Sequence, residues 1–153
     1  CVAVHPSDMC VALAALDAVV QVEGPNGTKR RINFTEFHRL PENAPERDTT
    51  LRHGELITSI DIPKNRFAAN SYYLKIRDRA SYAFALVSVA AALELDKGVI
   101  RQARIALGGV AHKPWRAAEA EKALIGKKPE AAAFQATAKL AVRDARPLSE
   151  NAY

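Results

Sequence analysis

The chain has 153 residues, and 48% of them are hydrophobic, which is enough to bury one substantial core or two small ones. The sequence lacks an apolar run of the roughly eighteen residues that a membrane span needs, and lacks the pattern of a signal peptide. The formal net charge is +5, but the 22 Lys and Arg residues are scattered without interleaved aromatics. We therefore expect a solvated surface and no nucleic-acid or membrane partner.

The two cysteines and the two ends of the sequence say little about structure. Cys1 and Cys10 provide neither a disulfide framework nor a CxxC metal pair. The chain begins with Cys and closes on PLSENAY, which contains no capped helix. We expect the sequence to be a fragment or a processed product.

The first elements follow from proline and capping signals. Residues 2–4 predict a short strand, and His5 lies before a proline, which pushes it out of the α region. Ser7 is a favourable N-cap, and Asp8 suits the positive end of a helix. We expect a helix from residue 8 to about residue 16.

A strong turn signal, GPNG, stands at residues 24–27. The flanking segments 20–23 and 29–32 are expected to pair as a hairpin. A short helix over 34–37 and an exposed, proline-bearing loop over 40–50 should follow.

Residues 55–63, ELITSIDIP, alternate as a strand does. Simple alternation places Leu56, Thr58, Ile60 and Ile62 on one face and Ile57, Ser59 and Asp61 on the other. Ile57 would then be a lone aliphatic on a polar face, explained either by a neighbouring loop or by a flat ligand. A domain boundary is expected after Pro63.

The longest apolar segment covers residues 82–95, and DKG at 96–98 separates it from an alternating segment over 99–107. Such a continuous run is either a strand covered on both sides or a helix, and the turn favours a β-hairpin. Gly108-Gly109 ends the second strand, where the backbone turns sharply or approaches something closely.

Two helices are expected near the end of the chain. The first covers residues 115–124, with Pro114 at its start and with Glu119, Glu121 and Lys122 pointing outward. Gly126 terminates it. The second covers residues 130–142, and a stripe made by Phe134, Ala138 and Ala141 suits close packing on the sheet.

The residues alone point to no catalytic chemistry. The four histidines lie in or near loops without matching carboxylate and serine patterns, and no pair has metal-ligand spacing. A glycine-rich phosphate loop is also missing from the sequence. These patterns define an α+β protein and nothing more specific.

Three segments together carry a family resemblance: HPSDMCVALAALDAVVQV, RHGELITSIDIP and YYLKIRDRASYAFALVSVAAAL. In order and spacing they resemble the C-terminal part of the FAD-binding subunit of the molybdenum hydroxylases, which include xanthine dehydrogenase, carbon monoxide dehydrogenase and bacterial aldehyde oxidoreductases. The resemblance implies an α+β fold. Residues 1–63 would end a PCMH-type FAD-binding domain, and residues 64–153 would form a small antiparallel sheet packed with helices, as in the CO dehydrogenase flavoprotein C-terminal domain.

The resemblance also implies roles for individual residues. Asp8 matches an aspartate that hydrogen-bonds the flavin, and Leu56 and Ile57 match an aliphatic pair packed against the isoalloxazine ring. Lys75 matches a lysine near the flavin edge, where a cation stabilises negative charge on the reduced ring. The alternative for Lys75 is a salt bridge to Asp61 or Asp78.

Four further positions are matched with less specificity. Some family members bind an extra four-iron four-sulfur cluster, and Cys1 stands where its last ligand would be, although one cysteine cannot hold a cluster. Cys10 replaces a small apolar residue and is expected to be buried and inert. Gly108 and Gly109 would allow close approach to the cofactor.

The implied function is electron transfer. Electrons from a substrate oxidised at a molybdopterin on a large subunit would pass through the two-iron clusters of a small subunit to FAD and then to an external acceptor. The loops that bind the FAD pyrophosphate in this family are not in this sequence. The alternative is a stand-alone protein-interaction module without cofactor. The resemblance is compatible with a cytoplasmic or a periplasmic location.

Overall fold

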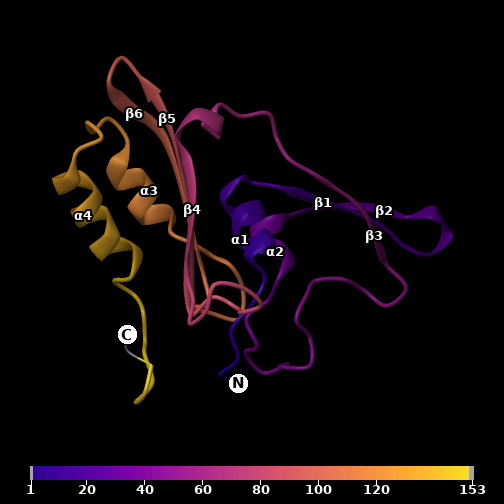
Figure 1. Cartoon of the computed structure of the whole chain (residues 1–153). Coiled ribbons are helices and arrows are strands. Elements are labelled where there is room, and N and C mark those ends of the chain that lie inside the picture. Colours follow the sequence, from indigo (N-terminus) through magenta and orange to yellow (C-terminus); the bar gives the residue numbers. More distant parts are fainter. Residues whose placement is uncertain (1, 152–153) are drawn as a thin grey trace.

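The computed structural model describes residues 2–151, which form two antiparallel sheets with helices between and beside them (Figure 1). One sheet has three strands in the order β2-β1-β3, and the other has four in the order β4-β5-β6-β7. The helices are α1 (Asp8–Ala15), α2 (Phe34–Phe37), α3 (Ala118–Leu124) and α4 (Ala131–Ala141), with 3₁₀ turns η1 (Pro25–Gly27) and η2 (Phe67–Asn70). The strands are β1 (Val19–Glu23), β2 (Lys29–Asn33), β3 (Leu56–Asp61), β4 (Ser71–Ile76), β5 (Val87–Asp96), β6 (Val99–Gly108) and β7 (Trp115–Arg116).

Helix α1 lies between the two sheets and joins them into one core. The predicted N-cap is confirmed, because the Ser7 hydroxyl accepts a hydrogen bond from the Cys10 amide at 3.3 Å. Val11 of this helix is 1% exposed and belongs to the same buried cluster as Val20 of β1 and Ala106 of β6. The hydrophobic core therefore crosses the division expected at Pro63.

The close packing of α1 on the four-stranded sheet depends on a glycine. A Cβ placed on Gly108, at the end of β6, would lie 2.5 Å from Val11 Cγ2 and 2.4 Å from Ser88 Oγ. Gly109 has φ +76°, and a Cβ there would lie 2.7 Å from the Leu86 carbonyl oxygen. The two glycines accommodate the chain's own helix and strand, and the space beside them is taken up by protein.

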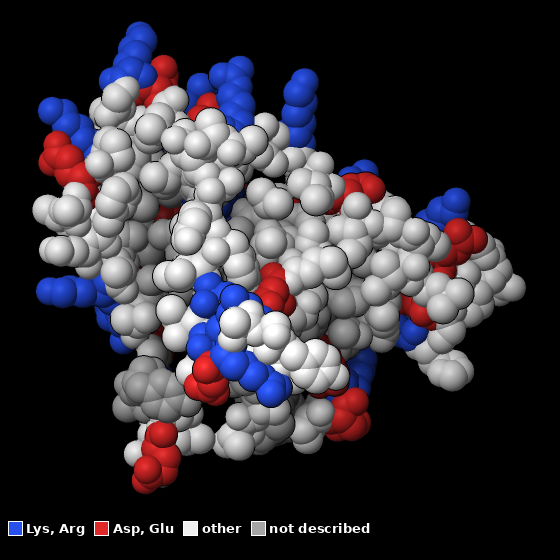
Figure 2. Space-filling model, in the orientation of Figure 1, with Lys and Arg blue, Asp and Glu red and all other residues white. Residues whose placement is uncertain are grey.

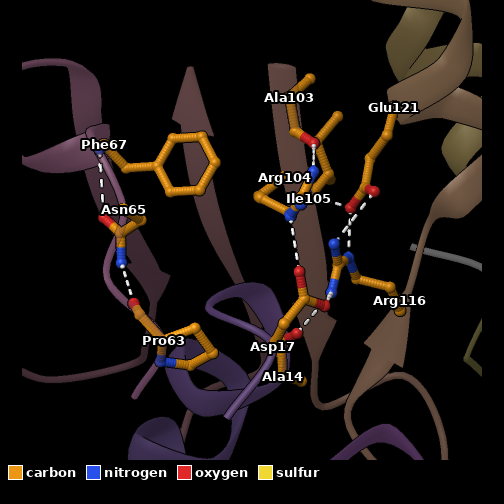
Figure 3. Close-up of polar contacts among 10 residues, drawn as sticks. All are labelled: Ala14, Asp17, Pro63, Asn65, Phe67, Ala103, Arg104, Ile105, Arg116 and Glu121. Carbon is orange, nitrogen blue, oxygen red and sulfur yellow. Dashed lines mark hydrogen bonds and ion pairs between the residues drawn. The ribbon is translucent and has the colours of Figure 1, made fainter. Parts of the chain in front are cut away.

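A network of charged side chains fastens the C-terminal end of α1 to the sheet (Figure 3). The Arg116 guanidinium donates to the Ala14 carbonyl and to Asp17, both at 2.6 Å, and also pairs with Glu121. Arg104 donates to the second oxygen of Asp17 at 2.8 Å. A cation at this end of a helix is favourable because the last carbonyls carry partial negative charge.

The expected start of the central hairpin is corrected by the structure. The turn at 96–98 and the pairing of β5 with β6 are confirmed, but β5 begins at Val87 and residues 82–86 form a loop. Tyr82 is 95% exposed and has φ +52°, which no strand tolerates. Arg79 holds this loop by donating to the Tyr82 carbonyl oxygen, at 2.5 Å from its terminal nitrogen.

Three other expectations about elements are wrong. Residues 2–4 form no strand, since no strand of the described range pairs with them. The helix expected from residue 115 begins at Ala118, because Trp115 and Arg116 pair with β6 as β7. Glu121 does not point outward: it is 8% exposed and accepts a 2.7 Å hydrogen bond from the Ile105 amide.

Strand β3 contains a β-bulge that simple alternation could not reveal. Val22 pairs with Ile57, whereas Gln21 pairs with Ser59, so Thr58 is the extra residue. Cross-strand partners share a face, and Ile57 therefore lies on the apolar face with buried Val22, not on the polar face.

The second face of the four-stranded sheet is covered by α3 and α4 (Figure 1). The stripe predicted on α4 does face the sheet, but close packing is wrong: an open apolar groove of about 450 Å³ lies between Phe134 and Ala138 of α4 and strand residues such as Leu74 and Val89. The longest strands are thus covered on both sides, with one side incompletely filled.

The close packing of α1 against Gly108 can be tested by Gly108→Ala. The added methyl has no room, because Val11 is β-branched and fully buried, and the free energy of unfolding should fall by about 1–3 kcal/mol in denaturant titrations. In a Val11→Ala background the same substitution should cost less, since one of the two clashing atoms is gone while Ser88 Oγ remains. An equal cost in both backgrounds would contradict this explanation.

Candidate functional site

The structure brings together two of the predicted flavin residues, Asp8 and Lys75. Asp8 opens α1, and Lys75 lies near the end of β4, 67 positions away in the chain. The Lys75 ammonium donates to Asp8 Oδ2 at 2.8 Å, while the Tyr73 hydroxyl donates to Oδ1 at 2.8 Å. The Asp8 side chain keeps 40% of its surface exposed, so its free lone pairs face solvent.

Tyr73 connects this carboxylate to the buried Ser88. The two hydroxyl oxygens lie 2.9 Å apart, and Ser88 is 3% exposed. Because the single phenol proton goes to the Asp8 carboxylate, which can only accept, the Ser88 hydroxyl must donate to Tyr73. The order of donors from Ser88 through Tyr73 to Asp8 is therefore fixed.

The pKa values reflect these contacts. Burial alone would raise the pKa of the Asp8 carboxyl, but hydrogen bonds from Lys75 and Tyr73 and the charges of Lys75 and Arg77 bring it below its usual range. Burial and the neighbouring Asp8 raise the pKa of the Tyr73 phenol to about 12, although the Ser88 hydrogen bond opposes the rise. At neutral pH the group contains a carboxylate and a protonated phenol.

The alternative partners considered for Lys75 are not the ones it contacts. Its ion pair is with Asp8, neither Asp61 nor Asp78. Asp61 instead accepts a 2.5 Å hydrogen bond from the Gln21 amide. The sequence could not reveal the Lys75 pair, because the two residues meet only when α1 packs against the four-stranded sheet.

Asp8 stands on the rim of a shallow depression formed by residues from both halves of the chain. The residues that line it are His5, Pro6, Ser7, Asp8, Val11, Ala85, Ser88, Gly108 and Gly109. The expected close approach at the two glycines is used by Val11 and by the Leu86 carbonyl rather than left open.

Leu56 and Ile57 lie at the start of β3, an edge strand among the described residues. Their side chains are 72% and 47% exposed, and no described segment covers them. As consecutive residues of a strand, the two lie on opposite faces of the sheet, so one flat ring would reach both only at the free edge of the strand. They do not contact Asp8 or Lys75 in the structure.

An ion pair fixes the backbone just before these residues. Both Glu55 oxygens accept from the Arg30 guanidinium, at 2.7 and 2.6 Å, and Oε2 also accepts from the Arg52 amide at 2.7 Å. Arg30 also donates to the Thr50 carbonyl at 3.0 Å. Arg30 first, and then the Arg52 amide, lower the pKa of Glu55 to about 2. Sequence reasoning gave neither residue a role.

Of the two cysteines, Cys1 lies outside the described residues, so its expected role as a cluster ligand stays a prediction. Cys10 is a free, partly buried thiol on α1, and the side chains of His5 and His38 lie close to it. No motif indicated this grouping, since the three residues come from three separate segments.

These features fit a bound flavin at two places. Asp8 offers a partly exposed carboxylate that can accept a further hydrogen bond, with a cation beside it. The start of β3 presents exposed aliphatic side chains that no described segment covers. A planar aromatic ring could pack against such an apolar surface. Within residues 2–151 no helix is long and apolar enough to cross a bilayer.

Comparison with known families defines the class of protein. Residues 1–65 match the FAD binding domain in molybdopterin dehydrogenase, and residues 72–152 match the CO dehydrogenase flavoprotein C-terminal domain. The chain therefore belongs to the family of FAD-binding subunits of the molybdenum hydroxylases, which confirms the resemblance carried by its sequence motifs.

Curated relatives place the chain within this family. It is 48% identical over 124 residues to the aldehyde oxidoreductase FAD-binding subunit PaoB of Escherichia coli, covering 81% of this chain and 37% of the relative. It is 37% identical over 122 residues to the glyceraldehyde dehydrogenase medium chain of Sulfolobus acidocaldarius, covering 80% of this chain and 41% of that one. The chain thus spans less than half of either relative.

Solved structures confirm the α+β fold. Quinoline 2-oxidoreductase from Pseudomonas putida 86 superposes with a TM-score of 0.80 at 27% identity, over 95% of this chain and 48% of that chain. CO dehydrogenase from Oligotropha carboxidovorans gives the same score and identity over 94% of this chain and 48% of that one.

The Asp8 ion pair predicts a change in titration. In Lys75→Met the pKa of Asp8 should rise toward its ordinary value of 3.8, as measured by carboxyl-carbon NMR, while the exposed Lys64→Met control leaves it unchanged. Because the folded pKa is depressed, the pair's contribution to stability is complete above pH 3.8 and is lost as pH falls through the folded value. An unchanged Asp8 titration would show that Lys75 does not stabilise the carboxylate.

The Glu55 ion pair makes a second pH prediction. Its contribution to the free energy of unfolding is complete above pH 4.5 and disappears between pH 4.5 and about 2, because the folded pKa is the lower one. In thermal unfolding followed against pH, Glu55→Gln should flatten this part of the profile. The exposed Glu46→Gln should preserve it, and equal profiles for both variants would refute the assignment.

Proposed function

We propose that this chain is the part of a molybdenum hydroxylase flavoprotein subunit that holds and tunes the flavin edge, in an assembly that oxidises aldehydes. The single observation that carries the proposal is the Asp8–Lys75 pair, which joins the two matched family segments at an exposed rim. Bound FAD would supply the acceptance and release of electrons. The division at Pro63 is proposed as a boundary between family segments that share one core.

Asp8 and Lys75 would act as a positioning pair. The Lys75 ammonium and the Tyr73 hydroxyl occupy one lone pair on each oxygen of the Asp8 carboxylate, which fixes its plane. The remaining lone pairs can accept a hydrogen bond from a ring N–H. A cation held within 2.8 Å of the carboxylate also offsets negative charge that arrives on the ring during reduction.

Leu56 and Ile57 would form the apolar support for the ring at the free edge of β3. Their exposed surface would be removed from water by the ligand, which is favourable at about 25 cal/mol per Å². The Arg30–Glu55 pair immediately before them would keep the strand in register.

The electron route is proposed from the family. Electrons would arrive from a substrate oxidised at a molybdopterin on a large subunit, through two-iron clusters on a small subunit, and would leave from FAD to an external acceptor. A four-iron cluster with Cys1 as one ligand would be an additional electron carrier on this route. Much of the surface between the charged side chains is uncharged, and some of its exposed apolar side chains would contact these subunits (Figure 2).

The competing possibility is a protein-interaction module without cofactor. The observation that favours it is the same exposed β3 strand, which could pair with another protein. The two possibilities differ in what a charge at Ile57 does, because only the flavin proposal requires an apolar surface there for the ring.

The test compares Ile57→Asp with Ile125→Asp, since both isoleucines are 47% exposed. Protein purified in its native assembly should contain about one FAD per chain. The FAD is released with acid and identified, and its amount is divided by the amount of protein calculated from the intact mass. Ile57→Asp should weaken FAD retention by more than about tenfold, because a charge would be buried against the ring. Ile125→Asp should retain the wild-type amount.

Loss of flavin in both variants would point to general destabilisation, which far-UV circular dichroism would show. Full flavin content and unchanged electron transfer in Ile57→Asp would favour the interaction module and overturn the proposed role of β3.

A further inference from the structure

Three side chains that ligate metals meet on the buried side of α1. They are His5 from the segment before the helix, Cys10 from the helix, and His38 from the segment after α2. One ligand atom from each lies within 4.8 Å of the other two. The imidazole rings of His5 and His38 are in contact, with centroids 4.4 Å apart and an interplanar angle of 62°.

Both histidines leave a nitrogen without a partner. His5 Nε2 and His38 Nδ1 are shielded from solvent, and neither has a hydrogen-bond partner. An unsatisfied buried polar atom costs about 1–3 kcal/mol, and native proteins rarely tolerate one without a reason. The same two histidines lie beside the free thiol of Cys10, and an ion bound to the three residues would give their rings a partner.

The His38 ring lies among aromatic side chains. His38 packs edge-on against Phe34 and Phe37, at centroid distances of 5.4 and 5.0 Å. These rings hold the His38 imidazole in place beside His5.

We infer that His5, Cys10 and His38 form a binding site for one thiophilic transition-metal ion, zinc(II) or copper(I). Two imidazoles and a thiolate are the donors that both ions accept. A tetrahedral zinc site needs ligand atoms roughly 3.3–3.6 Å apart, as bond lengths near 2.0–2.1 Å to nitrogen and 2.3 Å to sulfur imply. The observed limit of 4.8 Å exceeds this spacing, so binding would draw the three side chains closer together. Binding releases the thiol proton to solvent, so no oxidant is required.

The position of the site suggests a structural role. Cys10 is fixed by α1, whereas His5 lies in the segment before that helix and His38 directly follows α2. An ion bound to all three would tie the start of α1 to the end of α2, beside the rim on which Asp8 stands.

The test measures the zinc and copper content of the protein purified in its native assembly. After chelator treatment, wild type should take up one equivalent of Zn²⁺, or of Cu⁺ under anaerobic reducing conditions, and the two titrations decide which ion binds more tightly. Cys10→Ala and His38→Phe should each weaken binding by at least about tenfold, since a ligand is lost. His53→Asn changes an exposed histidine and should bind as wild type does. Far-UV circular dichroism of each variant reports whether it is folded.

A second measurement needs no variant that could fail to fold. Cobalt(II) added to metal-free wild type should produce a thiolate-to-cobalt charge-transfer band, and stoichiometric Zn²⁺ should abolish it. The proposal is overturned if wild type takes up neither Zn²⁺ nor Cu⁺. It is equally overturned if folded Cys10→Ala and His38→Phe bind the metal as tightly as wild type does.

Discussion

The fastening of α1 at both of its ends is the constraint on which the rest of the structure depends. At its N-terminus Asp8 is held by Lys75 and Tyr73, and at its C-terminus Arg116 binds the Ala14 carbonyl and Asp17. Each contact joins a residue from the first family segment to one from the second. Removing one member of such a partly buried pair leaves the other uncompensated, so the two segments stabilise each other.

This arrangement also explains how a structural contact and a cofactor contact can use the same carboxylate. Asp8 is oriented by two donors from the four-stranded sheet, yet it keeps 40% of its side-chain surface exposed at the rim. A flavin bound there would meet a carboxylate whose direction is already fixed, which lowers the entropy lost on binding. The price of this rigidity is that the site exists only when both segments are folded together.

Helix α1 also carries Cys10 and Val11, which contact residues of other segments. Cys10 lies one turn from its N-cap and faces two histidines from neighbouring segments, while Val11 fits against Gly108 of β6. A metal ion at Cys10 and an ion pair at Asp8 would both restrain the first turn of the helix. Flavin position and metal content would then depend on the same short stretch of backbone.

The sequence by itself determined the elements with strong local signals: the Ser7 cap, the GPNG turn, the DKG hairpin and, through its family motifs, the assignment of the chain to the FAD-binding subunits. Which side chains meet depends on how the elements pack. The partner of Lys75, the burial of Glu121, the bulge at Thr58 and the cluster around Cys10 all depend on contacts between segments distant in the chain. Turns and caps are set by residues within a few positions of one another, whereas ion pairs, register shifts and buried clusters are set by packing, which local periodicity does not encode.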